Sequence, residues 1–430
     1  MSTLHPKEVP SLVFANGKGE IIDYGGLRMA GSSGGAIISP SPDDLIELPE
    51  GSDLFVLPHR LPIGIEADTD EPAILESNPY ESGDGAFAVA AFMAPAYTSI
   101  YSTAYHKIEG KTKILPLFAY TAVGWYKGKF WVTAFRSDSD QRQDIENFNE
   151  QIIRKKTLKS LKAHPNNRLI QSLGKCCLTY RCPAARNYFL GRWEAPLPTS
   201  PICNAACIGC ISLQPSGCCP STQDRIQFVP KPSEIAEIAI PHLENAERPI
   251  VSFGQGCEGE PLLQESTIET AIKHIRAKTS KGTINLNTNG SLPLAVEKLA
   301  RNGLDSIRIS INSAQLEFHN RYYQPRGFDL NDVKQSARIM KKHGKHVSLN
   351  YFILPGFTDD PDEFSALCKL IETCNPDLIQ LRNLNMDPLY YLRCLKHNPD
   401  KDPMGIKTWL NKLRNLYPKL RFGYFNPALR

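Results

Sequence analysis

The stretch Cys203-Asn-Ala-Ala-Cys207-Ile-Gly-Cys210 carries three cysteines, with three and then two residues between them. Three thiolates at this spacing can wrap one face of a cubane iron–sulfur cluster, which leaves the fourth iron without a protein ligand. A structural zinc site is usually closed by two Cys-x-x-Cys pairs instead. The stretch therefore predicts an iron–sulfur site whose open iron can bind a small chelating molecule.

Strand and helix patterns alternate around and after this stretch. Five apolar runs read as strands: Ile250–Phe253, Ile284–Leu286, Ile307–Ile311, Val347–Leu354 and Leu378–Leu381. Helical patterns lie between them, so the chain predicts a parallel sheet with right-handed crossovers. Functional residues gather at the carboxyl ends of the strands in such a sheet. We expect an α/β core domain over residues 195–400, folded as a partial (βα)6-type parallel barrel.

The chain before this barrel divides into two segments of different character. Residues 1–140 hold short apolar runs punctuated by Gly, Pro and Asp, and Trp125–Trp131 reads as a hairpin that turns near Lys127-Gly128. We expect a β-rich N-terminal domain there. Residues 141–194 predict a basic helical linker, with a polar helix over roughly Gln141–Leu161 and a second short helix before Gly174.

The chain after the barrel, residues 401–430, predicts a C-terminal helix and strand. Near its other end, Met1–Ala30 shows no secretory signal, since charged residues and glycines interrupt any apolar run. The longest apolar stretch, Ala86–Ala94, is too short to span a bilayer. We therefore expect a cytoplasmic protein without a membrane segment.

Further motifs follow the cysteine stretch in a fixed order along the expected strands: Gly259-Glu260-Pro261, Thr288-Asn289-Gly290, Ser310, Asn350 and the turn Leu354–Asp359. Together with the three cysteines they make residues 196–385 resemble the radical S-adenosylmethionine (radical SAM) superfamily. A zinc or electron-transfer site has no use for the downstream motifs.

The resemblance implies a four-iron four-sulfur cluster ligated by Cys203, Cys207 and Cys210, and S-adenosylmethionine as the second cofactor. It implies cofactor-binding roles for six residues: Gly259, Glu260, Thr288, Ser310, Asn350 and Leu354. It also implies the reaction, in which the reduced cluster cleaves S-adenosylmethionine and the resulting 5′-deoxyadenosyl radical takes hydrogen from a substrate. Cluster and cofactor supply this chemistry, while the protein supplies orientation and exclusion of water.

Two departures from the family pattern affect the expected pocket. Gly209 stands before the third cysteine, where the family usually has an aromatic residue, so adenine stacking is expected from Phe357 or Ile353. Cys257 and Glu258 precede the Gly259-Glu260-Pro261 motif, and either they reach the active site or they shape the loop.

The chain has twelve cysteines, which favours metal or redox chemistry over disulfides in a cytosolic protein. Five of them flank the main motif: Cys176, Cys177, Cys182, Cys218 and Cys219. Two interpretations stay open for these five. They bind a second iron–sulfur cluster, or they are free thiols.

The segment Gln151–Trp193 contains ten Lys or Arg and no Asp or Glu. A solvated face is the usual meaning of a charge run. Here the complete lack of acidic residues favours an anionic partner. We expect an acidic electron donor such as flavodoxin or ferredoxin, because the reaction already requires one.

The substrate is not evident from the sequence. A peptide or protein side chain is the first hypothesis, since a separate N-terminal domain can present a large substrate, and RNA is the second. The rival from another class is a non-catalytic iron–sulfur electron carrier or a zinc-stabilised binding protein. Five residues are candidates for substrate contact: Cys257, Glu258, Tyr322, Tyr323 and Arg326.

Overall fold

The computed structural model describes residues 8–214, 217, 219–399 and 401–430. Contacts divide the chain into two compact units. The first unit holds the chain up to Ser139, Phe352–Ser365 and Leu381–Pro418. The second holds Asp140–Tyr351, Ala366–Gln380 and Lys419–Arg430. Because the chain returns twice to the first unit, the division into four consecutive parts stays a prediction.

The first unit is rich in β-structure, as the sequence predicted. Its strands are β1 (Ser11–Ala15), β2 (Ile21–Met29), β3 (Gly31–Ser33), β4 (Ala36–Ile38), β5 (Leu45–Glu47), β6 (Asp53–Leu57), β7 (Arg60–Ile65), β8 (Pro72–Ile74), β9 (Phe87–Phe92), β10 (Tyr97–Ser99), β11 (Ser102–Thr103), β12 (Tyr105–Lys107), β13 (Val123–Tyr126) and β14 (Lys129–Arg136). The larger sheet runs in the order β10-β14-β13-β1-β2-β7-β12, and a smaller one in the order β11-β3-β4. Small apolar side chains of β1, β9, β13 and β14 form one of its buried clusters.

The predicted hairpin joins β13 to β14. Tyr126 pairs with Lys129 in antiparallel register, which leaves a two-residue turn. Lys127 and Gly128 have φ angles of 47° and 81°. Two consecutive positive φ angles are typical of a type I′ turn, whose twist matches that of the strands. The hairpin prediction is confirmed.

A seven-stranded sheet forms the α/β core, in the order β15-β16-β17-β18-β19-β20-β21. Its strands are β15 (Arg192–Pro196), β16 (Glu247–Phe253), β17 (Thr283–Thr288), β18 (Ser306–Ile311), β19 (His346–Ile353), β20 (Leu378–Asn383) and β21 (Arg421–Gly423). The register from β15 to β19 and from β20 to β21 is parallel. The sequence prediction of a partial parallel barrel is confirmed.

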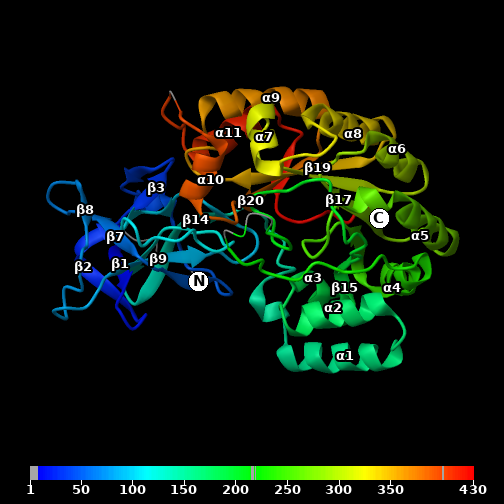
Figure 1. The fold of residues 1–430 in the computed structure, drawn as a ribbon, viewed down its shortest axis with the longest axis horizontal. Coiled ribbons are helices and arrows are strands. Elements are labelled where there is room, and N and C mark those ends of the chain that lie inside the picture. The colour runs from blue at the N-terminus through cyan, green and yellow to red at the C-terminus, as the bar shows by residue number, and fades with distance from the viewer. Residues whose placement is uncertain (1–7, 215–216, 218, 400) are drawn as a thin grey trace. The chain divides into compact units, whose positions relative to one another are not determined.

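Helices follow the strands of this sheet in sequence. They are α4 (Pro232–Asn245), α5 (Glu265–Lys278), α6 (Pro293–Arg301), α7 (Leu316–Tyr323), α8 (Leu330–Lys342), α9 (Pro361–Cys374), α10 (Pro388–Leu395) and α11 (Ile406–Leu416). In the second unit, α4, α5, α6 and α8 line the outer side of the curved sheet (Figure 1). Their apolar faces are buried against it, as with Ile268 and Ile272 of α5. The predicted C-terminal helix and strand are α11 and β21.

The basic segment contains three helices rather than two: α1 (Glu150–Ala163), α2 (Arg168–Leu178) and α3 (Pro183–Leu190). The first begins later than expected, because the Asn149 side chain caps it by accepting from the Ile152 N–H. The second was expected to end before Gly174 but runs through it. A Cβ at Gly174 would lie 2.6 Å from the Leu161 side chain, so the glycine lets α1 and α2 pack closely.

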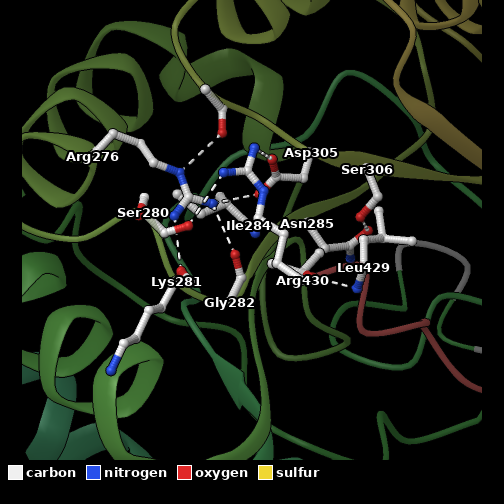
Figure 2. A network of polar contacts seen from close by, with 12 residues as sticks. Arg276, Ser280, Lys281, Gly282, Ile284, Asn285, Asp305, Ser306, Leu429 and Arg430 are labelled. Carbon is white, nitrogen blue, oxygen red and sulfur yellow. Dashed lines mark hydrogen bonds and ion pairs between the residues drawn. The ribbon is translucent and has the colours of Figure 1, made fainter.

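A polar network closes the amino ends of β17 and β18 (Figure 2). The buried carboxylate of Asp305 accepts from the Ile284 N–H at 2.9 Å and from the Arg276 guanidinium. Arg430 donates to the same carboxylate at 2.6 Å. The network therefore ties α5 and the C-terminal residues to the amino ends of the strands. The cysteine motif lies at the opposite, carboxyl ends.

Candidate active site

The three cysteines of the main motif lie in the loop after β15, at the carboxyl end of the strand. All three are partly buried. Burial raises the pKa of the Cys203 thiol and raises that of Cys207 well above its usual value. Cys210 and Cys203 also raise the pKa of Cys207, because a second or third thiolate nearby opposes the first. The three thiols thus share one site, and bound iron would provide the positive charge that such thiolates need.

Backbone groups of the loop after β16 hold the cysteine loop in place. Gly259 N–H donates to Ser200 C=O at 2.7 Å, and Glu260 N–H donates to Ile202 C=O at 2.9 Å. A Cβ at Gly259 would lie 1.9 Å from the Ile202 oxygen, a contact that backbone cannot relieve. Only glycine permits this approach. The expected contact between this motif and the methionine end of S-adenosylmethionine stays a prediction.

Glu258 supports the same loop through its buried carboxylate. One oxygen accepts from Thr199 N–H at 2.7 Å and from Ser200 N–H at 2.8 Å, and the other accepts from Gln255 N–H at 2.7 Å. Burial raises the pKa of Glu258 to about 7, although these hydrogen bonds lower it. Its side chain therefore has a positioning role, and the hypothesis of substrate contact gains no support from these partners.

The Glu260 carboxylate reaches the next strand end. It accepts from the Thr288 hydroxyl, from Asn289 N–H at 2.9 Å and from Leu262 N–H at 3.0 Å. Burial raises its pKa to about 7. Glu260 thereby fixes Thr288, another predicted cofactor-binding residue, against the loop after β16.

Asn204, inside the cysteine motif, joins this loop to the end of β17. Its amide donates to Ser291 Oγ at 2.9 Å and accepts from the Asn289 amide at 2.9 Å. The sequence interpretation gave no role to these three residues. Only their positions in the sequence could have indicated a role for two of them. Asn204 follows Cys203, and Asn289 lies within Thr288-Asn289-Gly290.

The end of α7 and the residues that follow it contact the cysteine loop from its other side. Ala206 N–H donates to Tyr323 C=O at 2.9 Å, Ile208 N–H donates to Tyr322 C=O at 3.1 Å, and Arg326 N–H donates to Asn204 C=O at 2.8 Å. Both tyrosine side chains are buried, whereas Arg326 is exposed. The three substrate candidates of this segment thus border the cluster site through their backbones, and substrate contact stays a prediction.

Arg225 supplies a cation beside Cys210 that the sequence interpretation missed. Its guanidinium lies 3.4 Å from Cys210 Sγ and donates to Ser212 Oγ at 3.1 Å. The contact places a cationic hydrogen-bond donor at one sulfur of the predicted cluster site. Arg225 follows Cys210 by fifteen positions in the chain, so no spacing rule could have indicated the contact.

Ser310 and Asn350 face each other on the neighbouring strands β18 and β19. Asn350 Nδ2 lies 3.5 Å from Ser310 Oγ, at the limit of a hydrogen bond. Asn350 Oδ1 is buried and has no hydrogen-bond partner among the described residues. A buried acceptor without a donor is costly. A ligand with hydroxyl or amino groups would satisfy it, so this pair fits the expected binding of S-adenosylmethionine.

The remaining predicted positions make other contacts. Leu354 belongs to the first unit, where its N–H donates to Thr358 Oγ1 at 2.8 Å within the Leu354–Asp359 turn. The Cys177 thiol lies 3.4 Å from Thr157 Oγ1, between α1 and α2. Cys219 is buried, and Cys218 lies outside the described residues.

A family model and a curated relative each match part of this chain. A family model described as the Radical SAM superfamily matches residues 197–368. The probable dual-specificity RNA methyltransferase RlmN of Clostridioides difficile (strain 630) is 26% identical over 200 residues, which are 43% of this chain and 55% of that protein. The chain thus spans about half the length of this curated relative. None of the helices in the described residues is long and apolar enough to cross a membrane.

Two solved structures are similar to this chain at low identity. Methylornithine synthase is 13% identical, with 66% of this chain and 77% of that chain covered and a TM-score of 0.38. SuiB of Streptococcus suis, solved with the precursor peptide SuiA, is 15% identical, with 56% and 53% covered and a TM-score of 0.38. The family match spans the cysteine loop, the Gly259-Glu260-Pro261 motif and Ser310. Residues 197–368 thus match the Radical SAM superfamily, a family whose members use a four-iron four-sulfur cluster and S-adenosylmethionine.

Proposed function

We propose that this enzyme reductively cleaves S-adenosylmethionine at a cluster held by Cys203, Cys207 and Cys210, and abstracts hydrogen from a peptide or protein. When bound, the cluster and S-adenosylmethionine supply the electron and the 5′-deoxyadenosyl radical. The chain's own residues hold the cysteine loop from both sides, present Ser310 and Asn350 to the cofactor, and keep the site partly buried. This preorganisation is what a protein contributes to cofactor chemistry.

The charge of the N-terminal segment supports a polypeptide substrate. Residues 1–140 contain 18 Asp or Glu and 10 Lys or Arg, a formal charge of −8, while the whole chain carries +4. An acidic domain repels the phosphate backbone of nucleic acid. A polypeptide meets no such general repulsion, and a domain of this size offers it a large surface.

RNA is the second candidate substrate. One observation favours it: the curated relative at 26% identity is described as an RNA methyltransferase. The exposed Lys and Arg of α1 also suit a phosphate backbone. The acidic N-terminal segment weighs against this candidate.

Substrate-dependent cofactor cleavage separates the two candidates. The reconstituted, reduced enzyme is incubated with S-adenosylmethionine and with either the peptide fraction or the RNA fraction of cells, and 5′-deoxyadenosine is measured. We expect the peptide fraction to raise release above the level without substrate, and protease treatment to remove the effect. A stimulation that follows the RNA fraction and is lost with ribonuclease would contradict the peptide assignment.

Cofactor affinity tests the roles of Glu260 and Ser310. Glu260→Ala removes the acceptor for Thr288 and Asn289, so we expect S-adenosylmethionine to bind at least about tenfold more weakly, or about 1.4 kcal/mol. Ser310→Ala removes one neutral hydrogen bond and should cost about 0.5–1.5 kcal/mol. Equilibrium binding to the reconstituted protein measures both effects, and iron content should stay unchanged. Full affinity in both variants would place the cofactor elsewhere.

The outer face of α1 supports an acidic electron donor as partner. Lys155, Lys156 and Lys159 are exposed there, together with the exposed apolar side chains Ile152 and Leu158. Within the second unit, α2 lies between α1 and α4 (Figure 1). Cations around apolar side chains form the charge complement of an acidic protein surface. We propose flavodoxin or ferredoxin as the occupant, since the reaction consumes single electrons.

Reversing Lys155, Lys156 and Lys159 to Glu is expected to slow turnover driven by flavodoxin and to spare turnover driven by dithionite, which needs no docking surface. The flavodoxin-driven rate of the unaltered enzyme should fall with salt, because exposed charges are screened over about 8 Å at physiological ionic strength. Three reversals on and after α8, at Arg338, Lys342 and Lys345, serve as the matched control and should change neither rate. Equal loss with both reductants in the α1 variant would argue against docking.

A further inference from the structure

Three cysteines from different segments converge beside the active site. Cys176 lies in the last turn of α2, Cys182 precedes α3, and Cys257 lies in the loop after β16. Cys182 N–H donates to Cys176 C=O at 3.2 Å, which closes the turn between the two helices. The thiols of Cys176 and Cys257 lie near each other, since each of them shifts the pKa of the other. All three are partly exposed.

Two contacts of the loop before α4 hold this arrangement together. Asp224 accepts from Lys175, the neighbour of Cys176, and from Tyr180. Ile226 N–H donates to Cys257 C=O at 2.8 Å. The Lys175–Asp224 ion pair is exposed and contributes little stability by itself. The ion pair fastens the end of α2 to the loop before α4, and the same loop contacts Cys257 through Ile226.

The mutual effects of the three thiols on ionisation agree with their nearness. Cys257 lowers the pKa of Cys176, Cys176 raises the pKa of Cys257, and Lys175 lowers the pKa of Cys176 further. Burial raises the pKa of Cys182, and so does nearby Cys176. Soft thiolate ligands select iron–sulfur clusters, zinc or copper(I).

We propose that Cys176, Cys182 and Cys257 bind a second iron–sulfur cluster next to the catalytic one. Cys257 stands two residues before Gly259, whose N–H holds the catalytic loop at Ser200. Arg225, next to Ile226 in the chain, lies against Cys210 Sγ. The three cysteines of the proposed second site and the three cysteines of the main motif are thus connected through the loop after β16 and the loop before α4. This set replaces Cys177 of the sequence hypothesis with Cys257, because the Cys177 thiol contacts Thr157 instead.

The three thiols are not arranged to bind a single metal ion. Within the described part of the chain, no three His, Cys, Asp or Glu side chains lie close enough together to bind one metal ion. That statement covers Cys203, Cys207 and Cys210 as well. In a cubane each thiolate binds a different iron atom, so its ligands stand further apart than those of a single ion.

The test removes the catalytic cluster first. The variant Cys203→Ala, Cys207→Ala, Cys210→Ala is reconstituted anaerobically with iron and sulfide, and metal and sulfide are assayed beside the visible absorption. We expect about four iron and four sulfide per chain, against about eight of each in the unaltered protein. Adding Cys176→Ala, Cys182→Ala and Cys257→Ala should reduce both to near zero. Adding Cys177→Ala instead is the matched control and should leave them unchanged.

Two further measurements, of folding and of the identity of the bound metal, make the outcome of this test unambiguous. Circular dichroism and gel filtration show whether each variant is folded. If the sixfold variant is not, Cys257→Ser alone in the threefold background, a change of one atom, should still lose most of the iron. A folded threefold variant without iron would overturn the proposal, as would zinc without sulfide or a Cys176–Cys257 disulfide in a protein that takes up no iron. None of these readouts depends on cofactor cleavage or on the substrate.

Discussion

Replacing any one of Cys203, Cys207 and Cys210 with alanine is expected to abolish the release of 5′-deoxyadenosine and methionine from S-adenosylmethionine. In the proposed site each thiolate would ligate one iron of the cluster, and the cofactor would bind the iron that has no protein ligand. A cluster with a missing ligand is lost or misplaced, so the expected effect is complete loss rather than a reduced rate. The measurement is product release by the reconstituted enzyme with dithionite under anaerobic conditions.

Cys374→Ala is the control for this experiment. Cys374 is a buried thiol at the end of α9, and burial raises its pKa to about 11, so it is an ordinary protonated core residue. Its variant should cleave S-adenosylmethionine at the normal rate. If the unaltered protein were fully loaded with iron and sulfide, reduced, and still never cleaved the cofactor, the assignment of the cysteine loop would be wrong.

The second large effect is expected on stability, from Asp305→Ala. This substitution leaves the Arg276 guanidinium, which is only 14% exposed, without its carboxylate partner. It also frees the Ile284 N–H at the start of β17 (Figure 2). Breaking a buried ion pair by removing one partner costs about 3–5 kcal/mol. Urea unfolding followed by circular dichroism should show the transition at a clearly lower concentration.

Glu297→Ala provides the comparison for this change. Glu297 pairs with Arg301 on the exposed side of α6, where the arginine is 66% exposed. Exposed pairs of this kind contribute about 0–1 kcal/mol. Similar unfolding midpoints for the two variants would show that the Asp305 network carries no special share of the stability.

The parts of the fold that sequence could predict are those set by local patterns. The apolar runs Ile250–Phe253 and Ile307–Ile311 lie within β16 and β18. Lys127-Gly128 forms the expected turn because backbone with two positive φ angles favours glycine in a two-residue hairpin. The end of α2 was misplaced, because Gly174 was interpreted as a helix stop. Its function is to let Leu161 approach, which depends on tertiary packing.

Contacts that depend on tertiary packing were even harder to predict in the candidate site than in the fold. The spacing of the three cysteines predicts their common ligand by local chemistry. The meeting of Cys176 with Cys257 depends on how α2 packs beside the loop after β16, 81 positions later in the chain. The contacts of Tyr322 and Tyr323 with the cysteine loop run through backbone groups, which every residue has, and therefore leave no trace in residue type. Arg225 is likewise visible only once the loop is folded.

The double anchorage of the cysteine loop bears on how this protein withstands oxygen. Exposed iron–sulfur clusters are destroyed by oxidation, and an enzyme whose loop collapsed with its cluster would have to be replaced. Here the backbone bonds from Gly259 and Glu260 on one side, and from the end of α7 and the residues after it on the other, hold the loop without any contribution from iron. We therefore expect the binding site to keep its shape when the cluster is lost. We expect a cell to repair it by inserting a new cluster into the old chain, at far lower cost than a new synthesis.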